Sequence, residues 1–231
     1  MFTLDQVVPW GRSFEEYSAM FEITDADMAG RVLGCGDGPA SFNAEATRRG
    51  ASVVSCDPIY RFGGAELEAR IADTYEQVID QTRQNQHEFV WEAITSVEEL
   101  GRVRMAAMQA FLDDYQAGVV AGRYVDAELP SLPFRDGEFD LALCSHFLFL
   151  YSRQLDEAFH QASLRELCRV AREVRVFPLL ALGGAVSPHV EGSVELLRAA
   201  GYSVSIERVS YEFQRGGNQV LRIRRAELAD G

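Results

Sequence analysis

The chain has 231 residues, and its content of 47 % hydrophobic and 25 % charged residues is ordinary for a globular protein with a sizeable core. Its net charge of −13 argues against binding to a nucleic-acid backbone as the main function, because like charges repel. All 22 basic residues are arginine, and the absence of lysine excludes P-loop nucleotide chemistry and enzymes that form a Schiff base with pyridoxal phosphate.

The first predicted helix covers residues 13–22. Ser13 and Glu16 have the spacing of a capping box, in which each side chain bonds the backbone of the other residue. The apolar residues that follow share one face of the helix: Phe14, Tyr17, Met20 and Phe21. We expect residues 1–29 to form an N-terminal helix and lid.

A strand–loop–helix–strand unit is predicted next. The sequence RVLGCGDG at 31–38 is a short strand that runs directly into a glycine-rich loop, and a helix at 40–49 follows and ends at Gly50. A second strand, Ser52–Cys56, then ends at Asp57. This order is that of one βαβ unit whose second strand ends in an acidic residue.

Residues 64–120 interrupt the alternation of strands and helices. They contain few turn signals and carry apolar residues at helical spacing, among them Leu67, Ile71 and Val78. Because the segment is too long for a single crossover helix, we interpret it as a helical insertion between the second and third strands. We expect this insertion to cap a substrate pocket.

The alternation resumes after the insertion. The remaining predicted elements are strands at 123–126 and 139–144, a helix at 155–171, a strand at 173–177, a helix at 190–200, and strands at 203–208 and 219–224. Strands that alternate with helices form a mostly parallel sheet covered on both faces. The prediction is therefore a single α/β domain over residues 1–231: a doubly wound seven-stranded sheet with an antiparallel C-terminal hairpin strand.

Cysteine usage and the N-terminus bear on metal binding and compartment. The cysteines, Cys35, Cys56, Cys144 and Cys168, form no CxxC pair, so zinc spacing is absent and small buried thiols are expected. The sequence contains no signal-peptide pattern and no apolar stretch long enough for a bilayer. We therefore expect a cytoplasmic protein with no metal site and no membrane contact.

The glycine loop predicts a nucleoside ligand. Gly34, Gly36 and Gly38 lie between a strand and a helix, and Asp57 follows Gly36 by 21 residues, a distance that suits a carboxylate bound to ribose hydroxyls. A tight turn without a ligand is the alternative. Pro39 has no N–H for a pyrophosphate, so NAD or FAD is the second choice of ligand.

Three spaced motifs resemble those of class I S-adenosylmethionine-dependent methyltransferases. The sequence LGCGDG at 33–38 is similar to the family's first motif, and VVSCDP at 53–58 to its second strand with a ribose-binding acid. The sequence YVDAELPSLPFRDGEFDLALCSH at 124–146 is similar to the third strand, loop and fourth strand. With the closing hairpin, the resemblance covers approximately residues 30–60 and 122–225 and implies S-adenosylmethionine as the cofactor.

The resemblance also implies which residues contact that cofactor. They are Gly34, Cys35, Gly36, Asp37, Gly38, Asp57, Pro58, Asp126, Ala127 and Ser145. Asp126 would accept a hydrogen bond from the adenine amino group, and the Ala127 amide would donate one to the ring. The family usually has an acid two positions before the first glycine, where this chain has Val32. Asp37 either substitutes for that acid or caps the following helix.

Further residues are candidates for catalysis and substrate binding. His146 is the predicted catalytic base, because histidine titrates near neutral pH, and a packing role is its alternative. Tyr17, Arg104 and Tyr151 are the predicted substrate contacts. Arg104 interrupts an apolar row, and its alternative is a side chain that extends to water. Arg12 lies just before the first helix, in the expected lid.

Several functions remain open from the sequence. The first is a methyltransferase for a small molecule, without nucleic-acid partners, as a monomer or a homodimer. The alternatives are a methyltransferase acting on protein or RNA, a non-catalytic S-adenosylmethionine-binding protein, and an NAD-linked oxidoreductase.

Overall fold

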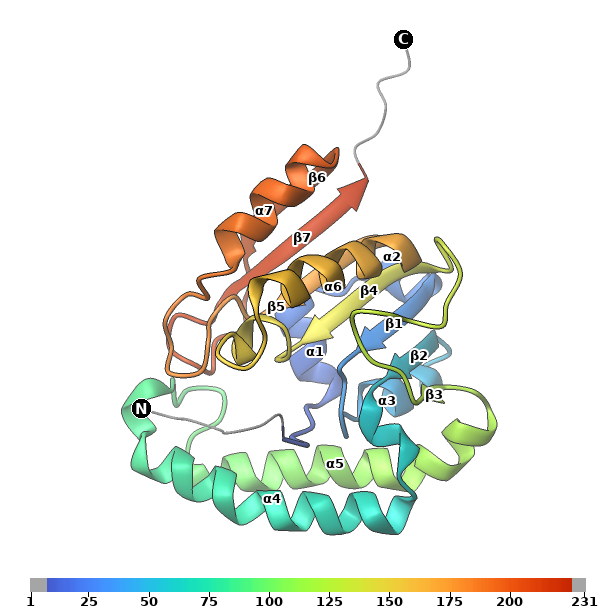
Figure 1. Cartoon of the computed structure of the whole chain (residues 1–231). Helices are drawn as coiled ribbons and strands as arrows, with labels where there is room; N and C mark the ends of the chain where they lie inside the picture. Colours follow the sequence, from blue (N-terminus) through green and yellow to red (C-terminus); the bar gives the residue numbers. More distant parts are fainter. Residues whose placement is uncertain (1–7, 226–231) are drawn as a thin grey trace.

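The computed structural model describes residues 8–225, and in this part of the chain the strands form one seven-stranded sheet (Figure 1). Their bounds are β1 Arg31–Cys35, β2 Ser52–Cys56, β3 Tyr124–Val125, β4 Phe139–Ser145, β5 Ala171–Phe177, β6 Tyr202–Arg208 and β7 Gln219–Arg225. The strand order is β3-β2-β1-β4-β5-β7-β6, and β7 runs antiparallel to both of its neighbours. The predicted fold class is confirmed. The third strand is shorter than predicted, since β3 has only two residues, and these pair with the last two residues of β2.

Helices cover both faces of the sheet. Helices α1 (Phe14–Phe21) and α3 (Phe42–Arg48) pack on the face that carries Val32 and Leu141. Helices α6 (Glu157–Val170) and α7 (Val190–Ala199) pack on the opposite face. Because the central strands are buried on both faces, they are continuously apolar rather than alternating.

The N-terminal segment contains the predicted helix and a second one. The capping box of Ser13 and Glu16 is present at the start of α1. A second capping box, Thr24 with Asp27, begins the short helix α2 (Asp25–Ala29), which sequence analysis did not predict. Residues 1–7 of the expected lid lie outside the described residues.

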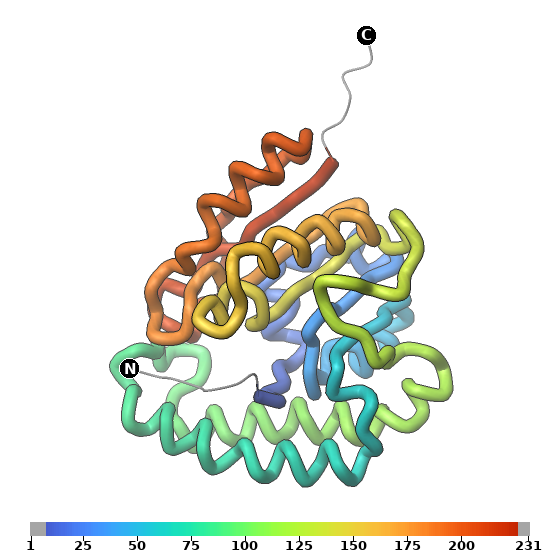
Figure 2. Tube along the Cα trace, viewed as in Figure 1, coloured from blue at the N-terminus to red at the C-terminus, as the bar shows by residue number. Residues whose placement is uncertain are grey.

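The predicted insertion is helical. It consists of α4 (Gly64–Gln84), the short 3₁₀ helix η2 (Gln86–Glu88) and α5 (Val97–Val120). The two long helices are antiparallel, because Arg83 lies near Glu98 at one end of the pair and Gly64 lies near Tyr115 at the other. Figures 1 and 2 show the pair crossing below the sheet, where the central strands end.

The loop between β6 and β7 closes the structure beside this insertion. Val90 donates a backbone hydrogen bond to Phe213, and Phe89 stacks on the Phe213 ring at 5.0 Å between centroids. The insertion is therefore joined to the far edge of the sheet. Two further 3₁₀ helices, η1 (Pro58–Arg61) and η3 (Phe149–Tyr151), lie shortly after β2 and β4.

Two further observations concern thiols and membranes. All four cysteines are free and buried, as predicted. Among residues 8–225, no helix is both long and apolar enough to span a lipid bilayer.

Candidate active site

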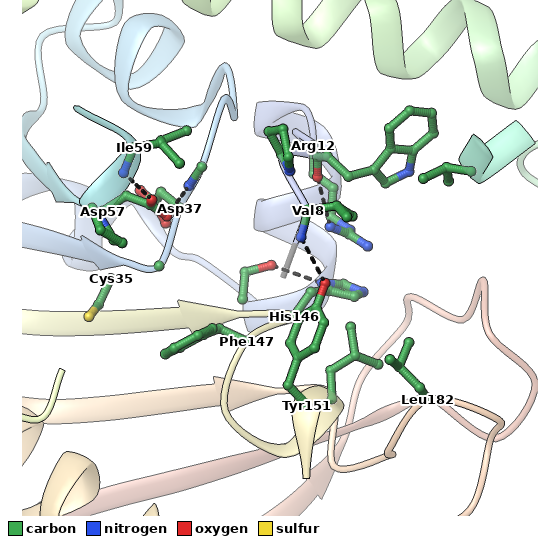
Figure 3. A pocket seen from close by; sticks show the side chains of 18 of the residues that line it. Val8, Arg12, Cys35, Asp37, Asp57, Ile59, His146, Phe147, Tyr151 and Leu182 are labelled. Atoms are coloured by element: carbon green, nitrogen blue, oxygen red, sulfur yellow. Dashed lines mark hydrogen bonds between the residues drawn. The ribbon is translucent and has the colours of Figure 1, made fainter. Parts of the chain in front are cut away.

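A cavity of about 620 Å³ lies where β1, β2 and β4 end, under the insertion helix α5. Its size is within the ~300–1,000 Å³ that is typical of small-molecule sites. Figure 3 shows Asp37 and Asp57 on one side and Arg12, with His146 beside it, on the other. We call the first side, with Asp37 and Asp57, the acidic end and the second side, with Arg12 and Arg104, the basic end.

The glycine loop forms the wall of the acidic end. Gly36 and Gly38 have positive φ angles of 67° and 54°, which residues with a Cβ rarely adopt. A Cβ on Gly36 would also lie 3.1 Å from the side chain of Phe147. The two glycines therefore allow the chain to turn tightly between β1 and α3 and leave backbone facing the cavity.

Asp37 folds back over the first strand. A Cβ on Gly34 would lie 1.8 Å from Oδ2 of Asp37, so the carboxylate occupies the space that a side chain of residue 34 would fill. The Tyr17 hydroxyl donates to it at 2.8 Å and the Ser55 hydroxyl at 2.6 Å. Asp37 is therefore held against the strand that lacks an acid at Val32, and its side chain does not cap α3.

Burial shifts the titration of this carboxylate. Desolvation raises the pKa of Asp37 to about 6, against the opposing effect of hydrogen bonds from Ser55 and Tyr17. A cationic group placed beside Asp37 would lower this pKa again and favour the ionised form.

Asp57 lies at the end of β2 and braces the loop. Its carboxylate accepts from the backbone N–H of Gly38 at 2.8 Å and of Ile59 at 2.9 Å. Burial raises the pKa of Asp57 to about 6, and the charges of Glu128 and Asp126 add to the effect. Each carboxylate oxygen has two lone pairs, so one on each remains for a ligand.

The segment after β3 contributes differently from the prediction. Ala127 lines the cavity, and so does Glu128, which sequence analysis did not select. Asp126 is exposed and is not part of the lining, so its predicted contact with adenine stays a prediction. Gly34 is also outside the lining and contributes by making room for Asp37.

His146 lies beside Arg12, at the basic end of the cavity. Its φ angle is +52°, which is unusual for a residue other than glycine and is typical of strain at functional sites. Its Nδ1 is 2.9 Å from the Ser145 hydroxyl, and its backbone N–H donates to Phe177 at 2.6 Å. Burial lowers the pKa of His146 well below its usual value, and the charges of Arg12 and Arg104 lower it further. The imidazole is therefore neutral at physiological pH.

Arg104 does not extend to water, so that interpretation was wrong. Its side chain is only 1 % exposed and forms an ion pair with Glu16 of α1. The Tyr211 hydroxyl holds the other carboxylate oxygen of Glu16 at 2.9 Å. Arg104 therefore joins the insertion to the first helix at the inner wall of the cavity.

The basic end has apolar and aromatic neighbours. Tyr151 lines the cavity, and its hydroxyl accepts from the backbone of Val8. The other apolar side chains of this part include Trp10, Val78, Phe89, Leu100, Leu150, Leu182 and Phe213. None of these was selected as a site residue from the sequence, because they come from distant loops and helices without a shared local pattern.

The structure brings together twelve of the fourteen predicted site residues in this one cavity. They are Tyr17, Cys35, Gly36, Asp37, Gly38, Asp57, Pro58, Arg104, Ala127, Ser145, His146 and Tyr151. Arg12, although it was expected to belong to the lid, was not among the predicted site residues.

Comparison with known proteins places the chain in a family. No protein-family model matches it. It is 33 % identical over 223 residues to the uncharacterized protein MJ0045 of Methanocaldococcus jannaschii, and the match covers 96 % of this chain and 98 % of the relative. The chain belongs to the family of MJ0045. This family membership carries no activity with it, because the relative is itself uncharacterized.

Solved structures similar to this member of the MJ0045 family are methyltransferases. The mitomycin 7-O-methyltransferase MmcR matches with a TM-score of 0.50 and 14 % identity, over 92 % of this chain and 54 % of that one. The magnesium protoporphyrin IX methyltransferase of Synechocystis PCC 6803, solved with bound S-adenosylhomocysteine, gives a TM-score of 0.49 and 15 % identity, over 92 % and 84 %. The chain thus has the Rossmann-like fold of class I S-adenosylmethionine-dependent methyltransferases, as its motifs predicted.

Proposed function

We propose that this protein is an S-adenosylmethionine-dependent methyltransferase that acts on a small molecule. The main support is one cavity that combines a glycine-walled acidic end with an apolar, basic end. The first suits an adenosyl-amino acid, and the second leaves room for a methyl acceptor beside it. A fold alone does not specify an activity, so the residues of the site carry the proposal.

The residues present fit the cofactor. Asp57 keeps acceptor capacity for ribose hydroxyls, and burial raises its pKa. Ile59, Ala127 and Leu129 offer an apolar surface for an adenine ring. Asp37, which is buried beside the glycine loop, suits the ammonium of the methionine part.

S-adenosylmethionine would supply a methyl group bound to a sulfonium, which is transferred to a nucleophile of the acceptor with S-adenosylhomocysteine as the leaving group. The protein's part is to align the acceptor and to exclude water. His146 is neutral and can accept a proton at its imidazole if the acceptor must lose one. The Ser145 hydroxyl at 2.9 Å from Nδ1 orients the ring.

The insertion supports a small acceptor rather than a macromolecule. Val78 and Thr82 of α4, with Leu100 and Arg104 of α5, form part of the cavity wall. The acceptor end is therefore overlaid by helices, and a nucleic acid would also meet a net charge of −13.

Calorimetry with S-adenosylhomocysteine and with NAD tests the cofactor. We expect saturable binding of S-adenosylhomocysteine that is weakened by Asp57→Ala, and no binding of NAD. Saturable NAD binding that depends on Asp57, with no response to S-adenosylhomocysteine, would contradict the proposal and favour an oxidoreductase. Cofactor binding without methyl transfer to any of a broad set of small acceptors would favour a non-catalytic binding protein.

A further inference from the structure

The basic end contains more positive than negative charge. Two guanidinium groups, those of Arg12 and Arg104, line the same part of the cavity and lie close enough for the charge of each to act on the other. Among residues 8–225, the only carboxylate that forms an ion pair with either of them is that of Glu16. The cluster thus has one positive charge in excess.

Both guanidinium groups also have unused donors. The Nε atoms of Arg12 and Arg104 are buried and have no hydrogen-bond partner among the described residues. Arg104 is only 1 % exposed, so bulk water does not supply the missing hydrogen-bond partner of its Nε. Buried donors without partners are rare in native proteins, and at a cavity wall they indicate a ligand group.

The neighbouring groups do not supply the missing negative charge. Oε2 of Glu16 accepts from Arg104 and from the Ser13 N–H, and Oε1 accepts from the Tyr211 hydroxyl. Burial raises the pKa of Tyr211, so its hydroxyl stays neutral. Burial and the charge of Arg104 both lower the pKa of Arg12, as expected for two cations that share too few anions.

His146 and Tyr17 face the same cluster without adding an anion. His146 is neutral for the reasons given above, and the two arginines are among the causes. Burial raises the pKa of Tyr17, so its hydroxyl keeps its proton and donates a hydrogen bond to Asp37. Tyr151 has a raised pKa through burial and is neutral as well.

We propose that Arg12 and Arg104 bind the carboxylate of the methyl acceptor, and that this acceptor is an apolar or aromatic monoanion. The excess of one charge matches a single carboxylate better than a phosphate dianion. The surrounding walls, with Trp10, Phe89, Leu100, Leu182 and Phe213, suit an apolar body. The inference rests on the proposed function, since it names the substrate class of the same site.

The cofactor also has a carboxylate, so two sources of this group must be distinguished. Arg104 is carried by α5, in the insertion, and Arg12 lies across the cavity from Asp37 and Asp57 (Figure 3). The acidic end, which we assign to the cofactor, is formed by the first βαβ unit. This separation favours the acceptor as the source.

The test measures binding of matched probes to the protein saturated with S-adenosylhomocysteine. The probes are 1-naphthoate and its neutral counterpart 1-naphthamide. Calorimetry measures the affinity of each. We expect naphthoate to bind roughly tenfold tighter or more, as charge-assisted hydrogen bonds require. Arg12→Met and Arg104→Met should each remove most of this preference. Arg102→Met, the same change at an exposed position of α5, should leave it unchanged.

Arg104→Met leaves Glu16 unpaired, and the protein could fail to fold for that reason. Arg12→Met keeps the test valid in that case, because Arg12 forms no ion pair within residues 8–225. Equal binding of the two probes, or no binding of either at millimolar concentration, would overturn the inference.

A second arm compares S-adenosylhomocysteine with 5′-methylthioadenosine, which lacks the amino-acid part. We expect Arg12→Met to change neither affinity by more than about twofold. If it weakened S-adenosylhomocysteine tenfold and left methylthioadenosine unchanged, the arginines would hold the cofactor's carboxylate and the inference would be wrong. Failure of the wild-type protein to bind S-adenosylhomocysteine would instead contradict the proposed function.

Discussion

The two ends of the cavity differ in charge and in how the chain builds them. Asp37 and Asp57 of the acidic end lie within one βαβ unit, and their burial raises both pKa values to about 6. Arg12 and Arg104 of the basic end come from the segment before α1 and from the insertion. The acidic end is thus formed by residues of one local unit, whereas the basic end is assembled by tertiary packing.

Each end of the cavity lacks counter-ions, and the missing charges have opposite signs at the two ends. The carboxylates have too few cations near them, and the guanidinium groups have too few anions. A cofactor with its ammonium beside Asp37 and an anionic acceptor beside the arginines would satisfy both. His146, which is neutral and lies beside Arg12, is the group best placed to act on the acceptor.

The largest expected effect comes from His146→Ala, which removes the predicted base beside Arg12. With an acceptor identified, kcat should fall roughly hundredfold or more, because a base acts in the transition state. The affinity for S-adenosylhomocysteine should change little. The exposed His87 provides the control, and His87→Ala should have no effect on either constant. Unchanged turnover in His146→Ala would reduce its role to packing.

Asp57→Ala removes one of the two carboxylates of the acidic end. The ligand would lose the charge-assisted hydrogen bonds from its two ribose hydroxyls to this carboxylate, each about 1.5–3 kcal/mol. S-adenosylhomocysteine should therefore bind at least about tenfold more weakly in calorimetry. Asp126→Ala should weaken binding less, because Asp126 is exposed at the rim. Asp73→Ala, an exposed change on α4, is the control. An equal loss in Asp73→Ala would show that the effect is general rather than local.

Gly34→Ala tests how the acidic end is supported. The new methyl group would meet Oδ2 of Asp37 at 1.8 Å and displace the carboxylate from Tyr17 and Ser55. We expect the free energy of unfolding to fall by about 1–3 kcal/mol in denaturant titrations, as for other overpacked sites. Gly64→Ala, where a Cβ meets only Tyr115 at 4.0 Å, should be close to neutral. An unchanged stability in Gly34→Ala would mean that Asp37 has another position of equal energy.

The dependence of cofactor binding on pH distinguishes the acidic end from the basic end without any substitution. Below a pKa of about 6, Asp37 and Asp57 take up protons and lose the charge that binds an ammonium and ribose hydroxyls. Affinity for S-adenosylhomocysteine should therefore be highest above pH ~7 and fall roughly tenfold per carboxylate by pH ~5. Asp37→Asn should reduce this dependence. An affinity independent of pH over that range would mean that neither carboxylate contacts the ligand as an anion.

The residues of the acidic end could be predicted because strand, turn and helix bring near neighbours in the sequence together. Gly36, Gly38 and Asp57 have the expected places, and the resemblance of LGCGDG to a known motif pointed to the same cavity. Asp126 was less predictable. A shift of one or two residues along a loop exchanges a side chain outside the cavity for a lining one, and Ala127 and Glu128 line the cavity there.

The sequence by itself determined the fold class, the helical insertion and the glycine loop with its strand-end acid, because these depend on apolar periodicity and local turn chemistry. Only the tertiary structure decided the environment of Arg104, whose partner Glu16 is 88 residues away along the chain. It also decided that Arg12 lies beside that pair and that His146 is neutral. Burial and charge at a site depend on which segments pack around it, and no local pattern in the sequence records that packing.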